Sequence, residues 1–399
     1  MDVDRQRAPA LVTITMTITA RTGLSLRTGT SQQRNPVLAA RELFEALCQP
    51  DIKLAVFYCA SDFDLSALAG ALRDNFGDIN LIGCTTAGEI TPQGYLDGAL
   101  TGFSLASDEM DVETRSFALD PFDSVRTASQ VTSLLGKLAV SSTPAPTAAD
   151  CFGFLLVDGL SMQEEMVVSC IHQHLRGIDL IGGSAADDVR FGATHLYHQG
   201  EFHQQVALLT VVRTTLPFVA FRTQHFVPSD KRMVVTGADP AQRVVYEING
   251  KPAAREYAQM VGLEIEELTP LVFASHPVMV RVGGQYFVRS IGKVNADGGL
   301  QFFCAIDEGI VLTIASGVNL IDNLEASFAS VREQIGAPQL VLGCDCVLRR
   351  IEMERDGLRE RVGHIYQENN VIGFATYGEQ FNAMHVNQTF TGIAIGRGA

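Results

Sequence analysis

One short pattern occurs three times along the chain and restricts the fold more than any other feature. In each copy an apolar run reaches a glycine, small residues follow, and an acidic residue comes next; the copies are Leu81–Glu89, Leu180–Asp187 and Val371–Glu379. An apolar run and a helical stretch precede each copy, and another apolar run follows it. Strands that alternate with helices of this length pair in parallel through right-handed crossovers. The sequence therefore predicts a repeated unit of strand, helix, strand, small-residue loop and strand.

The spacing of the copies predicts an α/β protein of two domains with mixed sheets. At 399 residues the chain is long enough for two hydrophobic cores. Turn residues near 235–243 mark a change of domain, and a β-rich segment at 271–315 is inserted in the second domain. We expect an N-terminal extension at residues 1–29, with a strand at Leu11–Ala20, a first domain at 30–242 and a second domain at 243–396.

The glycine shared by the three copies stands where a strand ends. Glycine there permits either a positive φ or a close approach of two backbones, and the small residues after it leave amides exposed. In open α/β sheets, ligands bind at the carboxyl ends of the strands. Both a ligand site at these loops and a turn needed only for packing remain open at this stage.

Charge and hydropathy exclude two classes of partner. Thirty Lys and Arg against 45 Asp and Glu give a net charge of −15, which repels phosphate backbones and anionic lipids, so we expect no nucleic-acid partner. No stretch approaches roughly 18 uninterrupted apolar residues, and the N-terminus lacks the apolar segment of a secretory signal. The eight cysteines lack the spacing of a disulfide framework. We therefore expect a cytoplasmic protein without a membrane span.

Several longer motifs follow one another along the chain from about residue 30 onward. Besides the repeat copies they are Gly102–Leu105, Tyr246–Ala253, Val288–Ser290, Cys346–Arg350 and Gly373–Gln380. Their order and spacing resemble the FIST family, a bacterial sensory pair of N- and C-terminal domains. Within it, the combination of Cys344–Arg350 with Tyr377–Thr389 is similar to the nitric-oxide-sensing branch (NosP).

The resemblance implies a function as well as a fold. Members of that branch bind haem b and regulate a partner, either a histidine kinase or a cyclic-di-GMP enzyme (a diguanylate cyclase or phosphodiesterase). The implied function is a sensor of nitric oxide, or another small diatomic ligand, that acts in trans; a homo-oligomer is left open. The alternative is a FIST sensory domain that binds a small metabolite such as an amino acid, without haem.

Haem sensing needs an axial ligand, usually a neutral imidazole, in an apolar pocket with Arg or Tyr donors for the propionates. His385 is our first candidate for the iron, because apolar residues flank it, amides follow it, and it comes directly after the third repeat copy. His276 is the second candidate. The candidate donors around haem are Arg289, Arg349 and Tyr377. A core histidine and surface arginines are the simpler interpretations of the same residues.

The other histidines are weaker candidates. His195, His198 and His203 cluster across a predicted turn, but His195 and His198 fall on opposite faces of a strand, which favours a solvated hairpin over a zinc site. His225 lies in an irregular stretch, and His364 is expected on the outer face of a helix.

Two cysteines and three carboxylates complete the candidates. Cys344 and Cys346 share a strand face, either as a buried pair or as a thiol ligand or redox pair. Glu89, Asp187 and Glu379 recur after the loops and are the remaining basis for a hydrolase or transferase. No nucleophile elbow, phosphate-binding loop, kinase signature or complete dinucleotide fingerprint occurs in the sequence, so we expect no enzyme.

Overall fold

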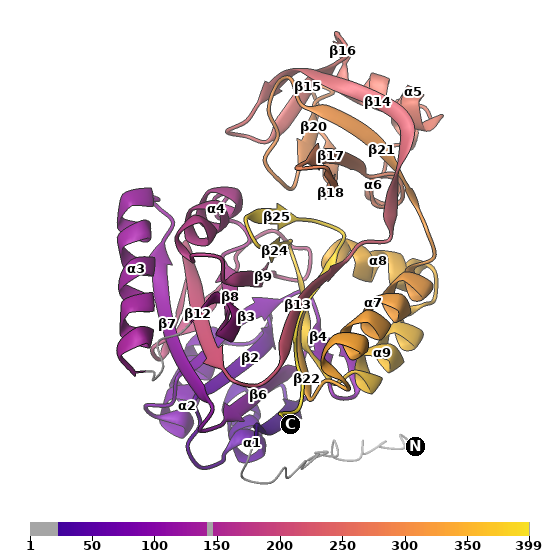
Figure 1. The fold of residues 1–399 in the computed structure, drawn as a ribbon. Coiled ribbons are helices and arrows are strands. Elements are labelled where there is room, and N and C mark those ends of the chain that lie inside the picture. Colours follow the sequence, from indigo (N-terminus) through magenta and orange to yellow (C-terminus); the bar gives the residue numbers. More distant parts are fainter. Residues whose placement is uncertain (1–22, 142–146, 399) are drawn as a thin grey trace, which may run out of the picture.

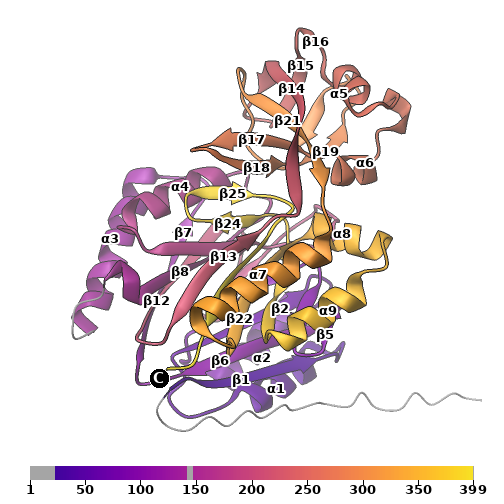
Figure 2. The same ribbon diagram turned by 45° about the vertical axis from the view of Figure 1, so that its right-hand side comes forward.

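The computed structural model describes residues 23–141 and 147–398, which form a body and a cap (Figure 1). The body contains three six-stranded sheets. The cap, residues 226–317, contains a further sheet and two helices, and it lies at one end of the body (Figure 2). The α/β class with mixed sheets and an inserted β-rich segment is confirmed.

The three sheets of the body have one plan, in which the strands run from an edge strand at one side to a hairpin at the other. The first contains β1 (Ser25–Ser31), β6 (Leu100–Ala106), β2 (Leu54–Ala60), β3 (Leu81–Thr86), β10 (Leu196–His198) and β11 (Glu201–His203). The second contains β7 (Met110–Ala118), β12 (Val206–Thr214), β8 (Cys151–Val157), β9 (Asp179–Ser184), β24 (Glu379–Phe381) and β25 (Met384–Val386). The third contains β13 (Phe218–Thr223), β26 (Phe390–Ile395), β22 (Leu340–Cys346), β23 (Val371–Thr376), β4 (Glu89–Thr91) and β5 (Gly94–Leu96).

The repeat is longer than the sequence pattern indicated. Each copy begins with an edge strand and a helix, continues through two parallel strands joined by helix, and ends with a hairpin and a return strand. In the third copy the cap is inserted between the edge strand β13 and helix α7. The two central strands of each sheet are parallel and their other neighbours antiparallel, which makes all three sheets mixed.

Each hairpin completes the sheet of a different repeat. The β4–β5 hairpin of the first repeat pairs with β23 of the third, and the β24–β25 hairpin of the third pairs with β9 of the second. The β10–β11 hairpin of the second repeat pairs with β3 of the first. This cyclic exchange gives the body an approximate threefold symmetry and ties its three repeats together.

The helices cover the outer faces of the sheets. The first sheet carries α1 (Pro36–Leu47) and α2 (Leu65–Phe76), the second α3 (Ser124–Ser141) and α4 (Glu164–His174), and the third α7 (Leu320–Ile335), α8 (Val347–Arg355) and α9 (Arg359–Glu368). The inner faces of all three sheets share one core, in which Tyr58 of the first sheet stacks on Phe374 of the third at 4.7 Å. Because both faces of each sheet are buried, the sequences of the central strands are almost entirely apolar.

The cap sheet is antiparallel throughout. Its order is β18 (Gln285–Arg289), β17 (Val278–Val282), β21 (Val311–Gly317), β14 (Phe226–Asp239), β15 (Val244–Ile248), β20 (Leu300–Phe302) and β19 (Ile291–Val294), with β16 (Lys251–Pro252) beside β15. Helices α5 (Ala253–Val261) and α6 (Pro270–Ser275) pack on it. The sequence motif Tyr246–Ala253 spans the end of β15, all of β16 and the start of α5.

The structure decides what the repeated glycine does. At Gly83, Gly182 and Gly373 an added Cβ would lie 1.8–2.6 Å from atoms of the neighbouring strand, and none of the three has a positive φ. Glycine is therefore required by close packing of the two parallel strands, and the alternative of a positive φ is wrong.

The predicted N-terminal extension belongs in part to the fold. Ser25, within that extension, begins β1 of the first sheet. The strand expected at Leu11–Ala20 lies outside the described residues. Within the described part of the chain, no helix is long and apolar enough to cross a membrane.

Candidate functional site

The three repeat loops meet at the end of the body that faces the cap. They follow β3, β9 and β23, and their backbones form a ring. Three N–H···O bonds close it, from Ala87 to Ala375 (3.0 Å), from Ala186 to Thr85 (2.9 Å) and from Tyr377 to Ser184 (3.2 Å). The carboxyl ends of all the parallel strands therefore converge at one place, which is where ligands bind in open α/β sheets.

Two of the repeated carboxylates hold this ring in shape. Glu379 accepts hydrogen bonds from the hydroxyls of Thr376 (2.5 Å) and Thr389 (2.6 Å), and Glu89 accepts one from the hydroxyl of Thr86 (2.5 Å) in the equivalent place. Burial raises the pKa of Glu379 to about 8 and that of Glu89 to about 7. Their hydrogen-bonding capacity is used within the fold.

The third carboxylate, Asp187, fixes a loop instead. It accepts backbone hydrogen bonds from Phe191 (2.9 Å), Gly192 (2.6 Å) and Ala193 (3.0 Å), and the hydroxyl of Tyr377 also donates to it. Burial alone would raise the pKa of Asp187, but these hydrogen bonds lower it below its usual range. The loop after β9 is thereby held over the end of the ring.

A cavity of about 280 Å³ lies between this loop and the cap, and we call it the cap cavity. The body contributes the chain after β8, the loop after β9, the start of α8 and Tyr377, and the cap contributes Ile291, Phe303 and Arg243. Three aromatic rings form one stack in its wall: Phe191 lies 4.8 Å from Tyr377 and 5.8 Å from Phe303, with nearly parallel planes. The cavity is thus mainly apolar and belongs to both parts of the molecule.

The rim of the cap cavity carries an unusual backbone. Met162, Val189 and Phe191 all line it, all are at least 40% exposed, and all have a positive φ (52–62°). Such a φ is an outlier for a β-branched or bulky residue. Residues held in this region cluster at ligand sites, because the surrounding structure keeps the strain in place.

An ion-pair group joins the cap to the body beside the cavity. The Arg243 guanidinium of the cap contacts Glu164 (2.6 Å) and Glu165 (2.7 Å) of α4, and Glu165 accepts the Ala305 N–H of the cap (2.5 Å). Because Arg243 and Glu164 are both less than 6% exposed, the contact is buried. It fixes the cap at one side of the cavity.

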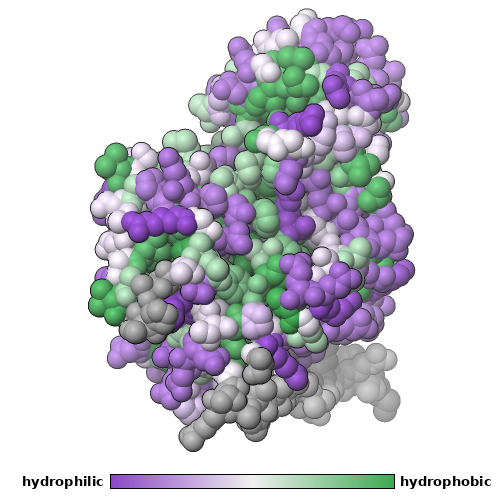
Figure 3. Space-filling model, in the orientation of Figure 1, coloured by the Kyte–Doolittle hydropathy of each residue, from purple (hydrophilic) through white to green (hydrophobic). Residues whose placement is uncertain are grey.

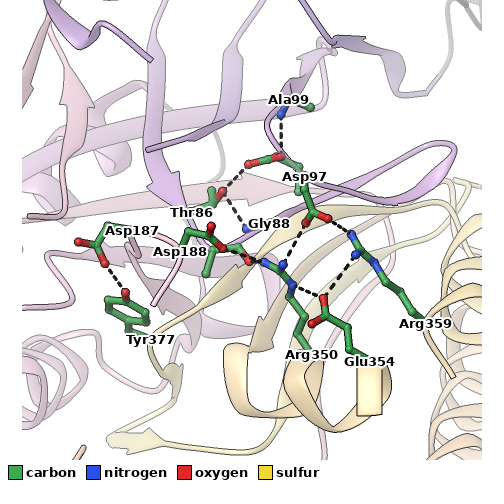
Figure 4. Close-up of polar contacts among 12 residues, drawn as sticks. Thr86, Gly88, Asp97, Ala99, Asp187, Asp188, Arg350, Glu354, Arg359 and Tyr377 are labelled. Atoms are coloured by element: carbon green, nitrogen blue, oxygen red, sulfur yellow. Dashed lines mark hydrogen bonds and ion pairs between the residues drawn. The ribbon is translucent and has the colours of Figure 1, made fainter. Parts of the chain in front are cut away.

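A second, polar pocket of about 140 Å³ is lined by the first repeat, the loop after β9 and Arg350 of α8, whose contacts Figure 4 shows. Arg350 of α8 crosses it and contacts Asp97 (3.2 Å), Asp188 (3.4 Å) and Glu354 (2.9 Å), as well as the Ala87 carbonyl. The charges of Arg350 are thus matched by protein groups, which makes this pocket a cross-link between repeats.

The structure brings three of the predicted site residues together. His385 in β25 is 1% exposed, and Arg289 of the cap donates to its carbonyl at 2.8 Å. Tyr377 precedes Gly378, which lies against the His385 ring. Burial lowers the pKa of His385 to about 4, so its imidazole is neutral. Its Nε2 has no hydrogen-bond partner among the described residues.

Arg349 lies elsewhere, in a buried charge network of the third repeat. It contacts Asp345 (2.7 Å) and His225 (3.0 Å), and Asp345 also accepts the hydroxyls of Tyr95 (2.6 Å) and Tyr366 (2.7 Å). The surface interpretation is therefore wrong for Arg349, which is fully buried, and for Arg289, which is 9% exposed. Arg349 stabilises the fold and does not reach the cap cavity.

His276 and the other candidate histidines form no hydrogen bond with His385 among the described residues. His276 ends α6 and its carbonyl accepts the Tyr257 hydroxyl at 2.7 Å. His198 and His203 lie on the hairpin β10–β11, His195 directly precedes β10, and His364 is exposed on α9. Cys344 and Cys346 are buried, and burial raises the pKa of both thiols. Within residues 23–141 and 147–398, no group of three His, Cys, Asp or Glu side chains is placed to hold a metal ion.

Apart from Tyr377, the sequence analysis missed the residues that form the cap cavity. Phe191, Arg243 and Phe303 lie far apart in the chain and carry no shared local pattern. The one local signal was Asp187 followed closely by Gly192, which is typical of a tight carboxylate-stabilised turn.

A body with cyclically exchanged hairpins, a cap inserted in its third repeat, and a ligand-sized cavity between them define a two-part α/β binding protein. Family models match a FIST N domain at residues 53–251 and a FIST C domain at residues 253–382. The chain belongs to the FIST family, whose domains have a sensory, ligand-binding role in signalling.

Two known proteins are similar to this chain. An uncharacterized protein of Methanocaldococcus jannaschii is 26% identical over 356 residues, which cover 79% of this chain and 67% of that protein. The crystal structure of a cyanuric acid hydrolase from A. caulinodans matches with a TM-score of 0.39 and 8% identity, over 94% of this chain and 99% of that one. A likeness of that size carries no conclusion about activity.

Proposed function

We propose that this protein senses a small, largely apolar molecule that binds in the cap cavity, and that binding changes how the cap rests on the body. The observation that carries the proposal is the cavity itself: a mainly apolar space of about 280 Å³, with an aromatic stack, built jointly by the two parts. A ligand there contacts body and cap at once, so its binding energy depends on their relative position.

The cavity indicates the size and chemistry of the ligand. An apolar cavity of roughly 150 Å³ holds one benzene ring in another protein, so the cap cavity has space for a ring with a substituent. Parallel aromatic faces favour a planar ligand. Of the two ligand classes that the sequence suggested, a small metabolite is the one this space fits directly; an amino acid with an aromatic side chain belongs to that class.

Calorimetry and thermal unfolding with toluene and indole test this function. We expect both compounds to raise the melting temperature in a concentration-dependent way, as a ligand of the native state must. Phe191→Ala removes the middle ring of the stack and should weaken binding at least tenfold, whereas Val125→Ala, exposed on α3, should leave it unchanged. Absence of any shift with both compounds, or unaltered binding by Phe191→Ala, would contradict the proposal.

Haem-based sensing of nitric oxide is the second candidate, and one observation favours it. His385 is neutral and its Nε2 is free of partners among the described residues, which is the state an axial ligand needs. The space does not fit haem in this conformation, because a Cβ on Gly378 would lie 2.7 Å from that nitrogen. A porphyrin over Nε2 requires the β24–β25 hairpin to move.

An absorption spectrum after haem titration separates the two candidates. A stoichiometric Soret band that shifts with nitric oxide and is lost in His385→Ala would support haem sensing. A spectrum equal to that of free haem would leave the metabolite function as the proposal.

The partner in trans is proposed to contact the cap. Hydrophobic side chains are exposed there, as Figure 3 shows for one face, and Val234 and Val311 lie directly opposite each other on β14 and β21 at 38% and 49% exposure. Exposed apolar patches commonly mark protein contacts. A histidine kinase or a cyclic-di-GMP enzyme is the proposed class of partner, and Val234→Asp should abolish its co-purification without unfolding the chain.

A further inference from the structure

The chain crosses twice between the body and the cap, and the two crossings lie side by side. Residues 224–225 lead from β13 of the body to β14 of the cap, and residues 318–319 lead from β21 back to α7. The Val318 N–H donates to the His225 carbonyl at 2.7 Å, and β14 and β21 pair with each other from Phe226 and Gly317 onward (Figure 1). Any movement of the cap on the body must therefore be absorbed by the backbone at these crossings.

His225 attaches this double crossing to helix α8. Its imidazole is fully buried, with Nε2 at 2.9 Å from the Glu352 carboxylate and Nδ1 at 3.0 Å from the Arg349 guanidinium. Because an arginine can only donate, Nδ1 accepts, and the proton of the neutral ring lies on Nε2 and is donated to Glu352. Burial lowers the pKa of His225, which favours this neutral form. Both ring nitrogens thus hold the crossing on one helix.

The same helix borders the cap cavity. Leu348 and Ile351 line the cavity, whereas Arg349 and Glu352 hold His225. Residues three apart lie on one stripe of a helix, and these two stripes are neighbours, rotated by about 100°. Helix α8 therefore connects the wall of the cavity directly to the crossing.

The cap meets the body at two joints of different kinds. At α4 the joint consists of side-chain contacts, chiefly those of Arg243 with Glu164 and Glu165, and such contacts can separate. At α8 the chain itself crosses, and Arg355 at the end of this helix also donates to the Ser275 hydroxyl of the cap helix α6. The cap can therefore turn about the α8 joint while the α4 joint opens or closes.

The other two repeats show that this attachment accompanies the cap and not the repeat itself. Their edge strands lead to a helix through residues 32–35 and 119–123, without an inserted domain. Neither of these connections contains a histidine. A buried histidine that is bonded through both ring nitrogens occurs where the cap is inserted.

We infer that His225 is the pivot of the cap, and that α8 transmits the presence of a ligand from the cap cavity to this pivot. A ligand in contact with Leu348 and Ile351 displaces the helix, and Arg349 and Glu352 move with it. His225 then changes the direction of the two paired strands that carry the cap. This inference rests on the proposed function and names how the same site controls the position of the cap.

Hydrogen exchange of the full chain, with and without saturating toluene, tests the pivot. The reporter is the Ala305 N–H, which donates to Glu165 at the α4 joint. In the parent protein we expect toluene to change the exchange rate of the peptide that contains Ala305 by about fivefold or more, the lower end of ordinary coupling between two sites.

Two variants remove the attachment of the crossing to α8. Glu352→Ala and His225→Leu should each still bind toluene in calorimetry, but the change at Ala305 should fall below about twofold, because the helix no longer moves the crossing. Glu352→Gln keeps an acceptor for the His225 Nε2–H and should restore the full change.

Glu354→Ala is the matched control, because Glu354 lies on the same helix but contacts Arg350 and Arg359. It should keep the full change. A full change in Glu352→Ala or His225→Leu would overturn the inference, as would loss of the change in Glu354→Ala. If both pivot variants lost toluene binding altogether, the contact would be purely structural and the inference would also fail. A parent protein that does not bind toluene, or binds it without any change at Ala305, would instead refute the proposed function.

Discussion

The hairpins of the first and third repeats have the same strand register, but their polar side chains are paired in opposite ways. In β4–β5, Tyr95 donates to Asp345 and Asp97 contacts Arg350 and Arg359. In β24–β25, the equivalent His385 and Asn387 retain free polar atoms among the described residues. The polar side chains of the first repeat's hairpin are paired with protein groups. Those of the third repeat's hairpin are fully hydrogen-bonded only when another molecule or solvent takes part.

This difference indicates which region of the molecule is less stable than the fold allows. An unsatisfied buried polar group costs about 1–3 kcal/mol, and the first repeat shows that this fold can avoid the cost. A region with several such groups, next to a cavity that two parts of the molecule share, is therefore a better candidate for function than the fully bonded region around Tyr95.

The largest expected effect on stability comes from removing Asp345, the carboxylate that accepts the Tyr95 hydroxyl of the first hairpin. Asp345→Ala leaves Arg349 charged and fully buried and also frees the hydroxyls of Tyr95 and Tyr366. We expect a loss of about 3–5 kcal/mol in the free energy of unfolding, as for other buried ion pairs that lose one partner. Urea unfolding measures it. Asp356→Ala, at an exposed ion pair, should cost less than about 0.5 kcal/mol, and a loss for Asp345→Ala as small as that of the control would show the network to be unimportant.

The next effect concerns the buried carboxylate that begins each of the two hairpins, Glu89 in the first and Glu379 in the third repeat. Because burial raises the pKa of Glu379 to about 8 from 4.5, the folded state holds one more proton than the unfolded state between these values. Stability therefore falls as the pH rises through this window, by up to about 1.4 kcal/mol per pH unit. Glu379→Gln keeps the hydrogen-bonding shape and should remove that part of the slope.

Unfolding at pH 5, 6.5 and 8 measures the slope for Glu379→Gln and for the control Glu354→Gln, which is partly exposed on α8. Identical pH profiles for the parent and Glu379→Gln would mean that this carboxylate titrates normally in the folded protein.

A smaller loss in the free energy of unfolding is expected when the β4–β5 hairpin loses one hydrogen-bond donor. Tyr95→Phe removes the hydroxyl that bonds to Asp345, while Tyr366 and Arg349 continue to satisfy this carboxylate. We expect a loss of about 1–2 kcal/mol, measured by urea unfolding against Tyr246→Phe, an exposed tyrosine of the cap. A loss equal to that of Tyr246→Phe would weaken the distinction between the two hairpins.

The smallest effect should have the opposite sign. His385→Phe replaces a buried imidazole with a free nitrogen by an apolar ring, and without ligand we expect unchanged stability or a gain of up to about 1 kcal/mol. A loss above about 2 kcal/mol in thermal unfolding would show that His385 makes a stabilising contact in the unliganded protein, and the comparison between the hairpins would then fail.

The sequence carried enough information for the central strand, helix and strand of each repeat, for its return strand and for a β-rich insertion, but not for the edge strand, the helix after it or the hairpin. Local signals were sufficient there, because residues that are adjacent in the sequence determine both the glycine after an apolar run and the extent of a helix. Asp64 illustrates this: it caps α2 by accepting the Ala67 N–H at 3.0 Å, so this helix start depends on residues only three positions apart.

The site was predictable only in part. Tyr377 was found because it lies within the third repeat copy, and His385 because it follows that copy. The cap cavity was not, since Phe191 and Phe303 meet only after the cap folds back onto the loop after β9, and no local pattern encodes that contact. Arg349 shows the reverse error. Its charge favoured a surface or ligand-binding role, but its ion pair with Asp345, four residues earlier, lets the side chain be buried in the core.

The cyclic exchange of hairpins has a consequence for how the chain is made. On the ribosome, β4–β5 emerges long before β23, the strand that it must pair with, and the second sheet stays incomplete at β9 until β24 has been made. The second sheet must therefore wait with an open strand edge, which is a site of mispairing. A gene fragment that ends after residue 251 would leave that edge permanently open, so the two halves are expected to be soluble only when they are produced together.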